Sequence, residues 1–432
     1  MNEVRNILVG LSINRDTSQL CYYDRKAGDA VSVPTKVGTN LYAFPTALLK
    51  APEENVWHIG FEAEYFEKKG EGIPIRNLLT KLTSGFTITI DGKKMSAPEL
   101  LAVFILESLK LLGIPNPVKS IRGIGVTTKD LTPETALSIR EALLCAGFAP
   151  DAASVMPEEE CFYYYGYSQR PEIWTRGLML IRFDGNHVSC DRMTEMRARK
   201  PFLVTVSHRG ETDLPMESTE RDEAFAQAVD EWGGSILCSG IFITGDGFSP
   251  SWAKRSIRAL SRAASHVFEG DNLFVKGACF GVYEKMERHA FKDRFYLGDH
   301  LVRGSLELMV LDAGTPSSFT LIHSGIGWYE NASTVEIILG GENGGRDEDA
   351  EEEVPYLTFR IRPMEREKHG EIRMELPDLP VSSCGMTRLL IEARCESAER
   401  FLIRAEDLGF GEFQPASHRV YTETVDLSEV EI

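Results

Sequence analysis

The stretch IFITGDGFSPSW, residues 241–252, decides the fold that this sequence predicts. The apolar run Ile236–Thr244 indicates a buried strand, and Gly245-Asp246-Gly247 forms the turn that follows it. Glycines at such a turn allow a close approach of the backbone, and Ser249-Pro250 then marks the start of a helix. The two glycines would serve either the packing of a strand-to-helix turn or contact with a ligand.

Strands and helices alternate on both sides of this turn, in two successive blocks. The predicted strands are Ile7–Ile13, Gln19–Tyr23, Ala30–Val33, Tyr42–Leu49, Ile121–Thr127, Ser154–Met156 and a hairpin over Leu178–Asp191 around Asp184-Gly185-Asn186. The predicted helices are Pro98–Gly113, one capped by Thr132, Pro157–Gly166, Glu220–Trp232, Trp252–Val267 and Leu273–Met286. The alternation predicts an α/β fold with two related lobes.

The pattern changes at residues 288–298. Seven short alternating segments follow, bounded by Gly, Pro, Asn or charged turns, which is typical of a β-sandwich. They are Val302–Val310, Phe319–Ile322, Thr334–Leu339, Tyr356–Ile361, Glu371–Leu376, Thr387–Ala393 and Phe401–Ala405. We therefore predict an α/β domain over residues 1–290 and an all-β domain over residues 295–432. Gly340–Glu353 between two of the strands is acidic and glycine-rich, and is expected to be a solvated loop.

The charge of the chain is concentrated in its β-rich part. The 432 residues include 47 Lys+Arg and 65 Asp+Glu, a formal net charge of −18. Residues 291–432 hold 14 basic and 28 acidic side chains, a net of −14, which leaves −4 for the first 290 residues. Proteins that bind nucleic acids normally carry a basic face, so nucleic acid is not an expected partner.

The cysteines, histidines and apolar runs exclude several other classes. The eight cysteines form no C-x-x-C pair and the histidines have no H-x-x-x-H spacing, so no metal site is expected from sequence. Scattered cysteines fit a reducing compartment. No run of about 18 uncharged apolar residues predicts a membrane helix, and the first residues do not resemble a signal peptide. A cytoplasmic protein with no membrane partner is expected.

The order of motifs resembles the DnaK-type heat-shock chaperones of the actin-like ATPase superfamily, in particular their shortened bacterial relatives. The matching segments are Ile7–Leu20, YAFPTALL, WHIGFEAE, GIGVTTKDLTPETALSIREALLCAGF, SVMPEEECFYYYGY, IRFDG, IFITGDGFSPSW and FVKGACFGV. The β-rich part takes the place of the sandwich that grips peptides in those chaperones. The resemblance covers most of the chain in order and pattern. It implies a two-lobed actin-like fold of ribonuclease H-like repeats, followed by a β-sandwich without a helical lid.

The resemblance also implies where ATP or ADP with Mg²⁺ would bind. Asp184 would hold a Mg²⁺-bound water, and Glu158 is the nearest counterpart of a second catalytic carboxylate. No other metal ligand is implied. The implied nucleotide-contacting residues come from the first hairpin, the second phosphate loop and the adenosine loop. They are Asn14, Arg15, Thr17, Gly185, Gly245, Asp246, Gly247 and Phe248.

The sequence departs from this family at the positions that carry its chemistry. Glu64 stands at the position of the family's catalytic lysine, so a carboxylate replaces the cation that would stabilise a γ-phosphate. Ser12 replaces an acidic residue, and Asn14 and Arg15 replace Gly and Thr. Only 61 positions separate Asp184 from Gly245, too few for the outer subdomain that clamps the adenine.

Structural interpretations compete with the functional ones at several of these residues. Asp184-Gly185 is also a strong hairpin signal, and the acidic run Glu158–Glu160 is also typical of a solvated face. The aromatic run Phe162–Tyr165 is more typical of the inner face of a helix than of a recognition cluster. Trp328-Tyr329 would be either the edge that grips a peptide or core aromatics of the β-sandwich.

These observations predict a protein- or peptide-binding or scaffold module with a degenerate nucleotide site that does not turn over ATP. Trp328 and Tyr329 are its candidate partner residues. Two alternatives remain open: a weak or unusual ATPase in which Arg15 and Asp184 rebuild the site, and an actin-like polymer former.

Overall fold

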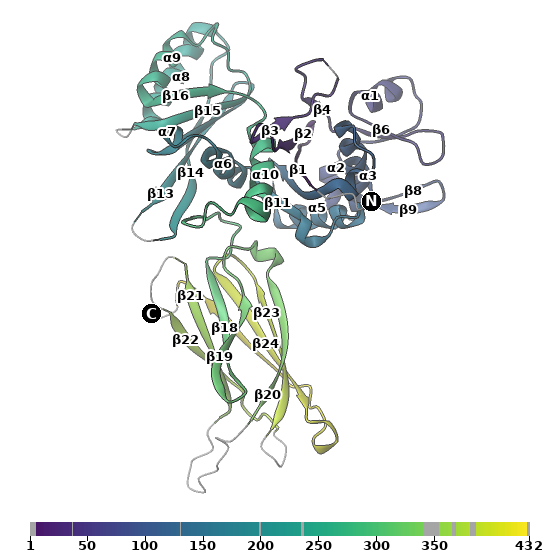
Figure 1. Ribbon diagram of the computed structural model, residues 1–432, viewed down its shortest axis with the longest axis vertical. Coiled ribbons are helices and arrows are strands. Elements are labelled where there is room, and N and C mark those ends of the chain that lie inside the picture. The colour runs from purple at the N-terminus through teal and green to yellow at the C-terminus, as the bar shows by residue number, and fades with distance from the viewer. Residues whose placement is uncertain are drawn as a thin grey trace. The chain divides into compact units, whose positions relative to one another are not determined.

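The computed structural model is a mixed α/β structure that forms two compact units, Met1–Tyr296 and Leu297–Ile432 (Figure 1). It describes residues 6–36, 38–129, 131–197, 200–234, 237–340, 354–364, 369–380 and 386–429. The acidic stretch 341–353, predicted as a solvated loop, lies outside these residues. Among the helices that the described residues form, none is both long enough and apolar enough to span a lipid bilayer.

The first unit begins with a sheet in the order β11-β10-β1-β2-β3, with β4 paired to β2. β10 runs parallel to both β1 and β11, whereas β1, β2 and β3 form an antiparallel meander. The strands are β1 Ile7–Ile13, β2 Thr17–Asp24, β3 Asp29–Ser32, β4 Ala43–Pro45, β10 Ile121–Thr128 and β11 Ala153–Pro157. Its apolar side chains, among them Leu11 and Val126, pack with helix residues such as Phe104 into one buried core.

A second sheet follows in the order β16-β15-β12-β13-β14-β17. β15 runs parallel to β12 and β16, and β12, β13 and β14 form an antiparallel meander. The strands are β12 Leu178–Asp184, β13 His187–Met196, β14 Phe202–Asp213, β15 Cys238–Asp246, β16 Ala264–Glu269 and β17 Arg294–Tyr296. Over five strands the two sheets therefore repeat one order and one set of directions.

Helices and two small sheets complete the first unit. The α-helices are α1 Gly60–Lys68, α2 Leu78–Leu82, α3 Ala97–Leu109, α4 Pro117–Ser120, α5 Pro133–Cys145, α6 Glu158–Ser168, α7 Pro171–Trp174, α8 Ser218–Gly233, α9 Lys254–Ala263 and α10 Leu273–Tyr283. The small sheets comprise β5 Leu48–Lys50, β6 Trp57–Ile59 and β7 Ile73–Ile75, and β8 Thr87–Ile90 and β9 Lys93–Ser96. The predicted cap is confirmed: the Thr132 hydroxyl accepts a hydrogen bond from the Thr135 amide.

Some boundaries predicted from sequence are wrong. The helix expected over Trp252–Val267 ends at Ala263, because Ala264–Glu269 forms the edge strand β16, parallel to β15. The strand expected over Tyr42–Leu49 is two strands, β4 and β5, which belong to different sheets. In both places, pairing with another strand overrides the local pattern.

Helix α10 packs against both the first sheet and α6, at positions where only glycine fits. A Cβ on Gly277 would lie 2.1 Å from the Cys161 carbonyl oxygen of α6, and a Cβ on Gly10 of β1 would lie 2.2 Å from the Val275 carbonyl oxygen. Both distances are far below van der Waals contact. The backbones of α10, α6 and β1 therefore touch directly.

The second unit consists of two four-stranded antiparallel sheets, ordered β19-β18-β21-β22 and β20-β23-β24-β25. Alternate residues of both sheets, among them Leu308, Phe359, Ile391 and Phe401, form one buried core. The strands are β18 Gly304–Asp312, β19 Thr315–Ile322, β20 Ala332–Leu339, β21 Tyr356–Pro363, β22 Gly370–Glu375, β23 Thr387–Cys395, β24 Arg400–Gly409 and β25 Val420–Asp426.

The tight packing of α10 predicts that Gly277→Ala lowers the free energy of unfolding by about 3 kcal/mol, because the new methyl group collides with backbone rather than with a side chain that can move. Gly233→Ala at the end of α8 is the matched control, since its Cβ would only meet Ala263 Cβ at 3.5 Å. Urea denaturation monitored by circular dichroism measures both. Equal stability of the two variants would contradict the packing argument.

Candidate functional site

The turn between β1 and β2 is tied to the end of β10 by one side chain. The Asn14 Oδ1 atom accepts hydrogen bonds from the Lys129 amide at 2.9 Å and from the Thr128 hydroxyl at 3.4 Å. Asn14 Nδ2 donates to the Ser12 hydroxyl at 3.4 Å. Asn14 thus organises the turn through contacts within the protein.

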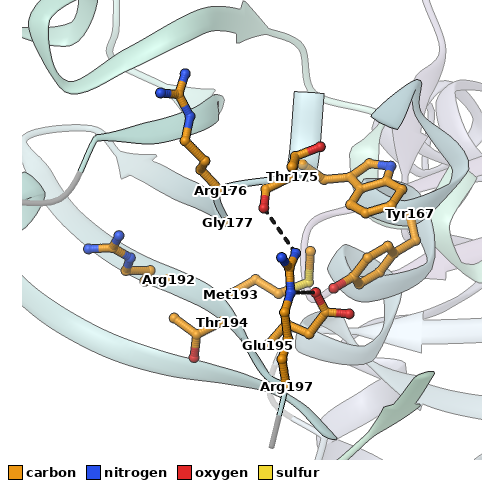
Figure 2. A pocket seen from close by; sticks show the side chains of 10 residues that line it. Tyr167, Thr175, Arg176, Gly177, Arg192, Met193, Thr194, Glu195 and Arg197 are labelled. Atoms are coloured by element: carbon orange, nitrogen blue, oxygen red, sulfur yellow. Dashed lines mark hydrogen bonds and ion pairs between the residues drawn. The ribbon is translucent and has the colours of Figure 1, made fainter. Parts of the chain in front are cut away.

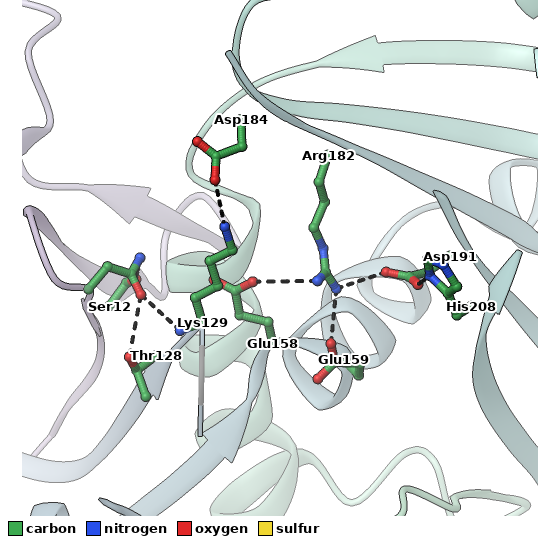
Figure 3. A network of polar contacts seen from close by, with 10 residues as sticks. Ser12, Thr128, Lys129, Glu158, Glu159, Arg182, Asp184, Asp191 and His208 are labelled. Atoms are coloured by element: carbon green, nitrogen blue, oxygen red, sulfur yellow. Dashed lines mark hydrogen bonds and ion pairs between the residues drawn. The ribbon is translucent and has the colours of Figure 1, made fainter. Parts of the chain in front are cut away.

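Lys129 connects this turn to the second sheet. Its Nζ atom lies 3.0 Å from Asp184 Oδ2 at the end of β12, and the hydrogen bond lowers the pKa of the Asp184 carboxyl below its ordinary value (Figure 3). Both side chains are exposed. Asp184 also begins the predicted hairpin, in which it pairs with His187. The carboxylate expected to hold a Mg²⁺-bound water is therefore neutralised by a lysine.

A half-buried arginine neutralises the other candidate carboxylate. Arg182 lies 3.9 Å from Glu158, 3.1 Å from Glu159 and 3.0 Å from Asp191, and Asp191 also contacts His208 Nδ1 at 3.2 Å (Figure 3). Burial opposes the charge of Arg182, but the three carboxylates raise the pKa of the guanidinium. Glu158 and Glu160 are 3% and 4% exposed, so the interpretation of Glu158–Glu160 as a solvated face is wrong. Glu160 is held by Lys285 at 2.8 Å.

Other groups of the protein already bind the backbone of the Gly245-Asp246-Gly247 turn. The Gly245 amide donates to Asp271 Oδ1 at 2.9 Å, and the Asp246 carbonyl accepts from the Gly185 amide at 2.8 Å. A Cβ on Gly245 would lie 2.0 Å from the Phe183 carbonyl oxygen, and one on Gly247 would lie 2.1 Å from the Gly185 carbonyl oxygen. These glycines are required by the packing of β12 against β15.

The remaining predicted residues lie near these groups in different environments. Arg15 and Thr17 are exposed at the β1–β2 turn. Phe248 is half-buried and its ring packs with Phe183 and Phe225, 5.6 and 6.1 Å between centroids. Phe248 is thus part of an aromatic cluster.

The two candidate partner residues belong to the second unit, apart from this site. Trp328 and Tyr329 lie in a short 3-10 helix with their rings 5.8 Å apart and nearly perpendicular. Trp328 packs against the core of that unit, and both side chains are half-buried. Their surroundings agree with the interpretation as packing aromatics.

Sequence reasoning missed Lys129, Arg182, Asp191 and Asp271. Lys129 directly follows β10, and the ends of parallel strands are where polar groups meet in α/β sheets, which is a signal that could have found it. Arg182 interrupts the apolar strand LMLIRFD, and a charge in a buried strand indicates a buried partner.

A magnesium nucleotide, which the family resemblance implies here, does not fit these groups. Asp184 already accepts from Lys129, Arg182 already holds Glu158, and the Gly245 amide already donates to Asp271. Within the described parts of the chain, no three His, Cys, Asp or Glu side chains are grouped so that they could hold a metal ion. The charges of Lys129, Asp184, Arg182 and Glu158 are therefore each paired with a protein group of opposite sign.

The first unit is thus a mixed α/β structure in which Lys129 is paired with Asp184 and Arg182 with Glu158, and a β-rich unit follows it in the chain. Residues 29–299 match the family of unknown function DUF5716, over the part described as its C-terminal region, and the chain belongs to this family. Residues 301–427 match the domain of unknown function DUF8552. No curated protein matches the chain significantly.

The two ion-pair groups are expected to differ in their contribution to stability. Arg182→Met leaves the buried Glu158 and Asp191 without this cation and is expected to lower the free energy of unfolding by about 3–5 kcal/mol. Lys129→Met removes only an exposed pair and is expected to cost less than about 1 kcal/mol. Chemical denaturation measures both variants. A larger loss for Lys129→Met than for Arg182→Met would contradict this description of the site.

Proposed function

We propose that this protein is a non-hydrolysing relative of the DnaK-type, actin-like proteins, which binds a protein or peptide partner as a scaffold. In this proposal the first unit consists of two ribonuclease H-like repeats, and the second unit is a β-sandwich. The shared strand order of the two sheets, β11-β10-β1-β2-β3 and β16-β15-β12-β13-β14, supports the repeats. The two facing antiparallel sheets with one core support the sandwich.

The observation that carries the proposal is the Lys129–Asp184 ion pair, 3.0 Å long, between the ends of β10 and β12. In the resembled ATPases the corresponding region receives the phosphates and Mg²⁺. Here a phosphate would compete with Asp184 for Lys129, and a magnesium ion would compete with Lys129 for Asp184. Glu64, which stands at the position of the catalytic lysine, adds a negative charge instead of the cation that a γ-phosphate needs.

In this proposal the β-rich unit supplies the surface for the partner. Leu311, Phe319 and Ile338 are 69%, 44% and 60% exposed on three of its strands. Exposed apolar side chains of this size favour contacts with another chain. The net charge of −14 over residues 291–432 favours a partner segment with basic flanks.

We expect no saturable heat when the full chain is titrated with Mg-ATP or Mg-ADP in a calorimeter, and no phosphate release above background. The physical reason is that both interlobe charges are already paired. Asp184→Ala serves as the comparison and should behave as the wild type does. Micromolar binding of Mg-ATP that Asp184→Ala abolishes would refute the proposal in favour of the ATPase, and nucleotide-dependent sedimentation would favour the polymer former.

We also expect the full chain to bind extended apolar peptides with basic flanks on a peptide array. The double variant Leu311→Ser/Ile338→Ser should bind them about fivefold more weakly, because each change removes exposed apolar area from the contact. Leu137→Ser, at a 45% exposed position in the first unit, is the control with the same chemical change. No enrichment of such peptides, or equal loss in the control, would count against a β-rich binding surface.

A further inference from the structure

Strand β16, Ala264–Glu269, is an open edge of the second sheet. It is the last strand in the order β16-β15-β12-β13-β14-β17 and pairs with β15 alone among the strands of the described residues. Residues 265–269 are all exposed. They include neither proline nor lysine, two residues with which natural proteins protect an edge strand. Such an edge is a template for another strand.

The backbone of β16 has hydrogen-bonding groups on its outer side. The Gly270 amide donates to the Ile243 carbonyl oxygen of β15 at 3.0 Å. Because successive residues of a strand direct their backbone groups to opposite sides, residues 266 and 268 also face β15, and the alternate residues face away from it. These outward-facing residues are Ser265, Val267 and Glu269. A further strand can pair with them without disturbing the sheet.

One face of this edge is aromatic. The rings of His266 and Phe268 are nearly parallel, with their centroids 6.2 Å apart, and Phe268 stacks on Phe242 of β15 at 5.2 Å. Phe242 in turn contacts the ring of Tyr165, in α6, at 5.3 Å. Phe268 is nevertheless 38% exposed, since β16 is the last strand of its sheet. The row of rings therefore stops at the open edge.

The opposite face is also apolar at the edge. Val267, 39% exposed, pairs with Ile241, whose side chain packs in the core with α9. Val267 therefore lies on the face that α9 covers. On α9, Arg262 bonds to Asp230 of α8, and helical spacing places the exposed Ile257 on the side away from α8. Both faces of β16 thus present apolar side chains to solvent.

Two exposed charges of opposite sign lie at the two ends of this edge. Arg176 donates to the Ser265 hydroxyl at 3.0 Å. Figure 2 shows its side chain extending away from Glu195, which accepts from Arg197 at 2.7 Å instead. Neither Arg176 nor Glu269 forms an ion pair with a described residue. The four residues from Ser265 to Glu269 span about 13 Å of strand, so these two charges do not meet within one chain.

We propose that β16 joins two copies of this chain through an antiparallel pair of β16 strands, with Val267 opposite Val267 of the second copy. In this register Glu269 lies opposite Ser265 of the second copy, and therefore beside the Arg176 that Ser265 binds. His266 lies opposite Phe268, which continues the row of rings from one copy to the other. The pairing overlaps all five exposed residues and forms about six backbone hydrogen bonds.

Charge and symmetry both restrict this pairing. A symmetric register centred on Glu269 would place two carboxylates opposite each other, which is unfavourable, whereas the register centred on Val267 forms two ion pairs with Arg176. Two-fold pairing uses the edge of both copies, so the assembly closes as a dimer and does not continue into a filament. This dimer does not depend on the partner surface proposed for the β-rich unit.

The test is sedimentation equilibrium of the full chain without nucleotide, from about 1 μM to about 100 μM protein. At the upper end the mass is expected to be twice the 48.2 kDa of the chain. Val267→Pro should weaken dimerisation at least about tenfold, because it removes an outward-facing N–H that the pairing with β15 does not use. Val267→Lys should weaken it as strongly, because it places two positive charges opposite each other. Circular dichroism checks that both variants stay folded.

A charge exchange tests the register. Arg176→Glu and Glu269→Arg each place like charges side by side across the dimer, so each variant alone should dimerise severalfold more weakly than the wild type. The double variant Arg176→Glu/Glu269→Arg should dimerise more tightly than either single variant, because it forms the same ion pairs in the opposite sense. Rescue of this kind is not expected if the two residues only support the fold of their own copy.

Val420→Lys is the matched control, since Val420 is an exposed valine of β25, an edge strand of the second unit. It should dimerise as the wild type does. The proposal is overturned if the wild type is monomeric at all concentrations, or if Val420→Lys weakens the dimer as much as Val267→Lys. A monomeric wild type whose binding to array peptides is lost in Val267→Lys would assign the edge to a strand of another protein, and would also overturn the dimer.

Discussion

The contact of α10 with α6 and β1 is the constraint on which the rest of the first unit depends. Gly277 brings the backbone of α10 against the Cys161 carbonyl of α6, and Gly10 brings β1 against the Val275 carbonyl of α10. α6 precedes the second sheet in the chain and β1 belongs to the first sheet. One helix therefore fixes both halves of the unit at the closest distance that a polypeptide backbone allows.

This fixed distance explains how the charges between the two large sheets come to be paired. Lys129 at the end of β10 and Asp184 at the end of β12 are 55 residues apart in sequence, yet their side chains meet at 3.0 Å. Arg182, two residues before Asp184, reaches Glu158 at the start of α6. In both pairs the cation and the carboxylate belong to different elements: β10 and β12 for Lys129 and Asp184, and β12 and α6 for Arg182 and Glu158. The chain satisfies these charges itself, which agrees with the proposal of a relative that does not hydrolyse ATP.

The parts of the structure that could be predicted from sequence are those set by local signals. Thr132 marks a helix start because its hydroxyl caps the next turn, and Asp184-Gly185 marks the hairpin between β12 and β13. The strand β16 could not be predicted, because its residues form a strand only by pairing with β15. Burial of Glu158 depends in the same way on Arg182, which is 24 positions further along the chain.

The backbone contact at Gly277 also determines how the two halves of the first unit can move. Packed helices slide past one another when side chains at the contact change rotamer, which spreads the movement over many small steps. A glycine against a carbonyl oxygen has no rotamer to change. Shear between α10 and α6 is therefore blocked at this point. The two halves are expected to diffuse and tumble as one rigid body, without hinge motion between them.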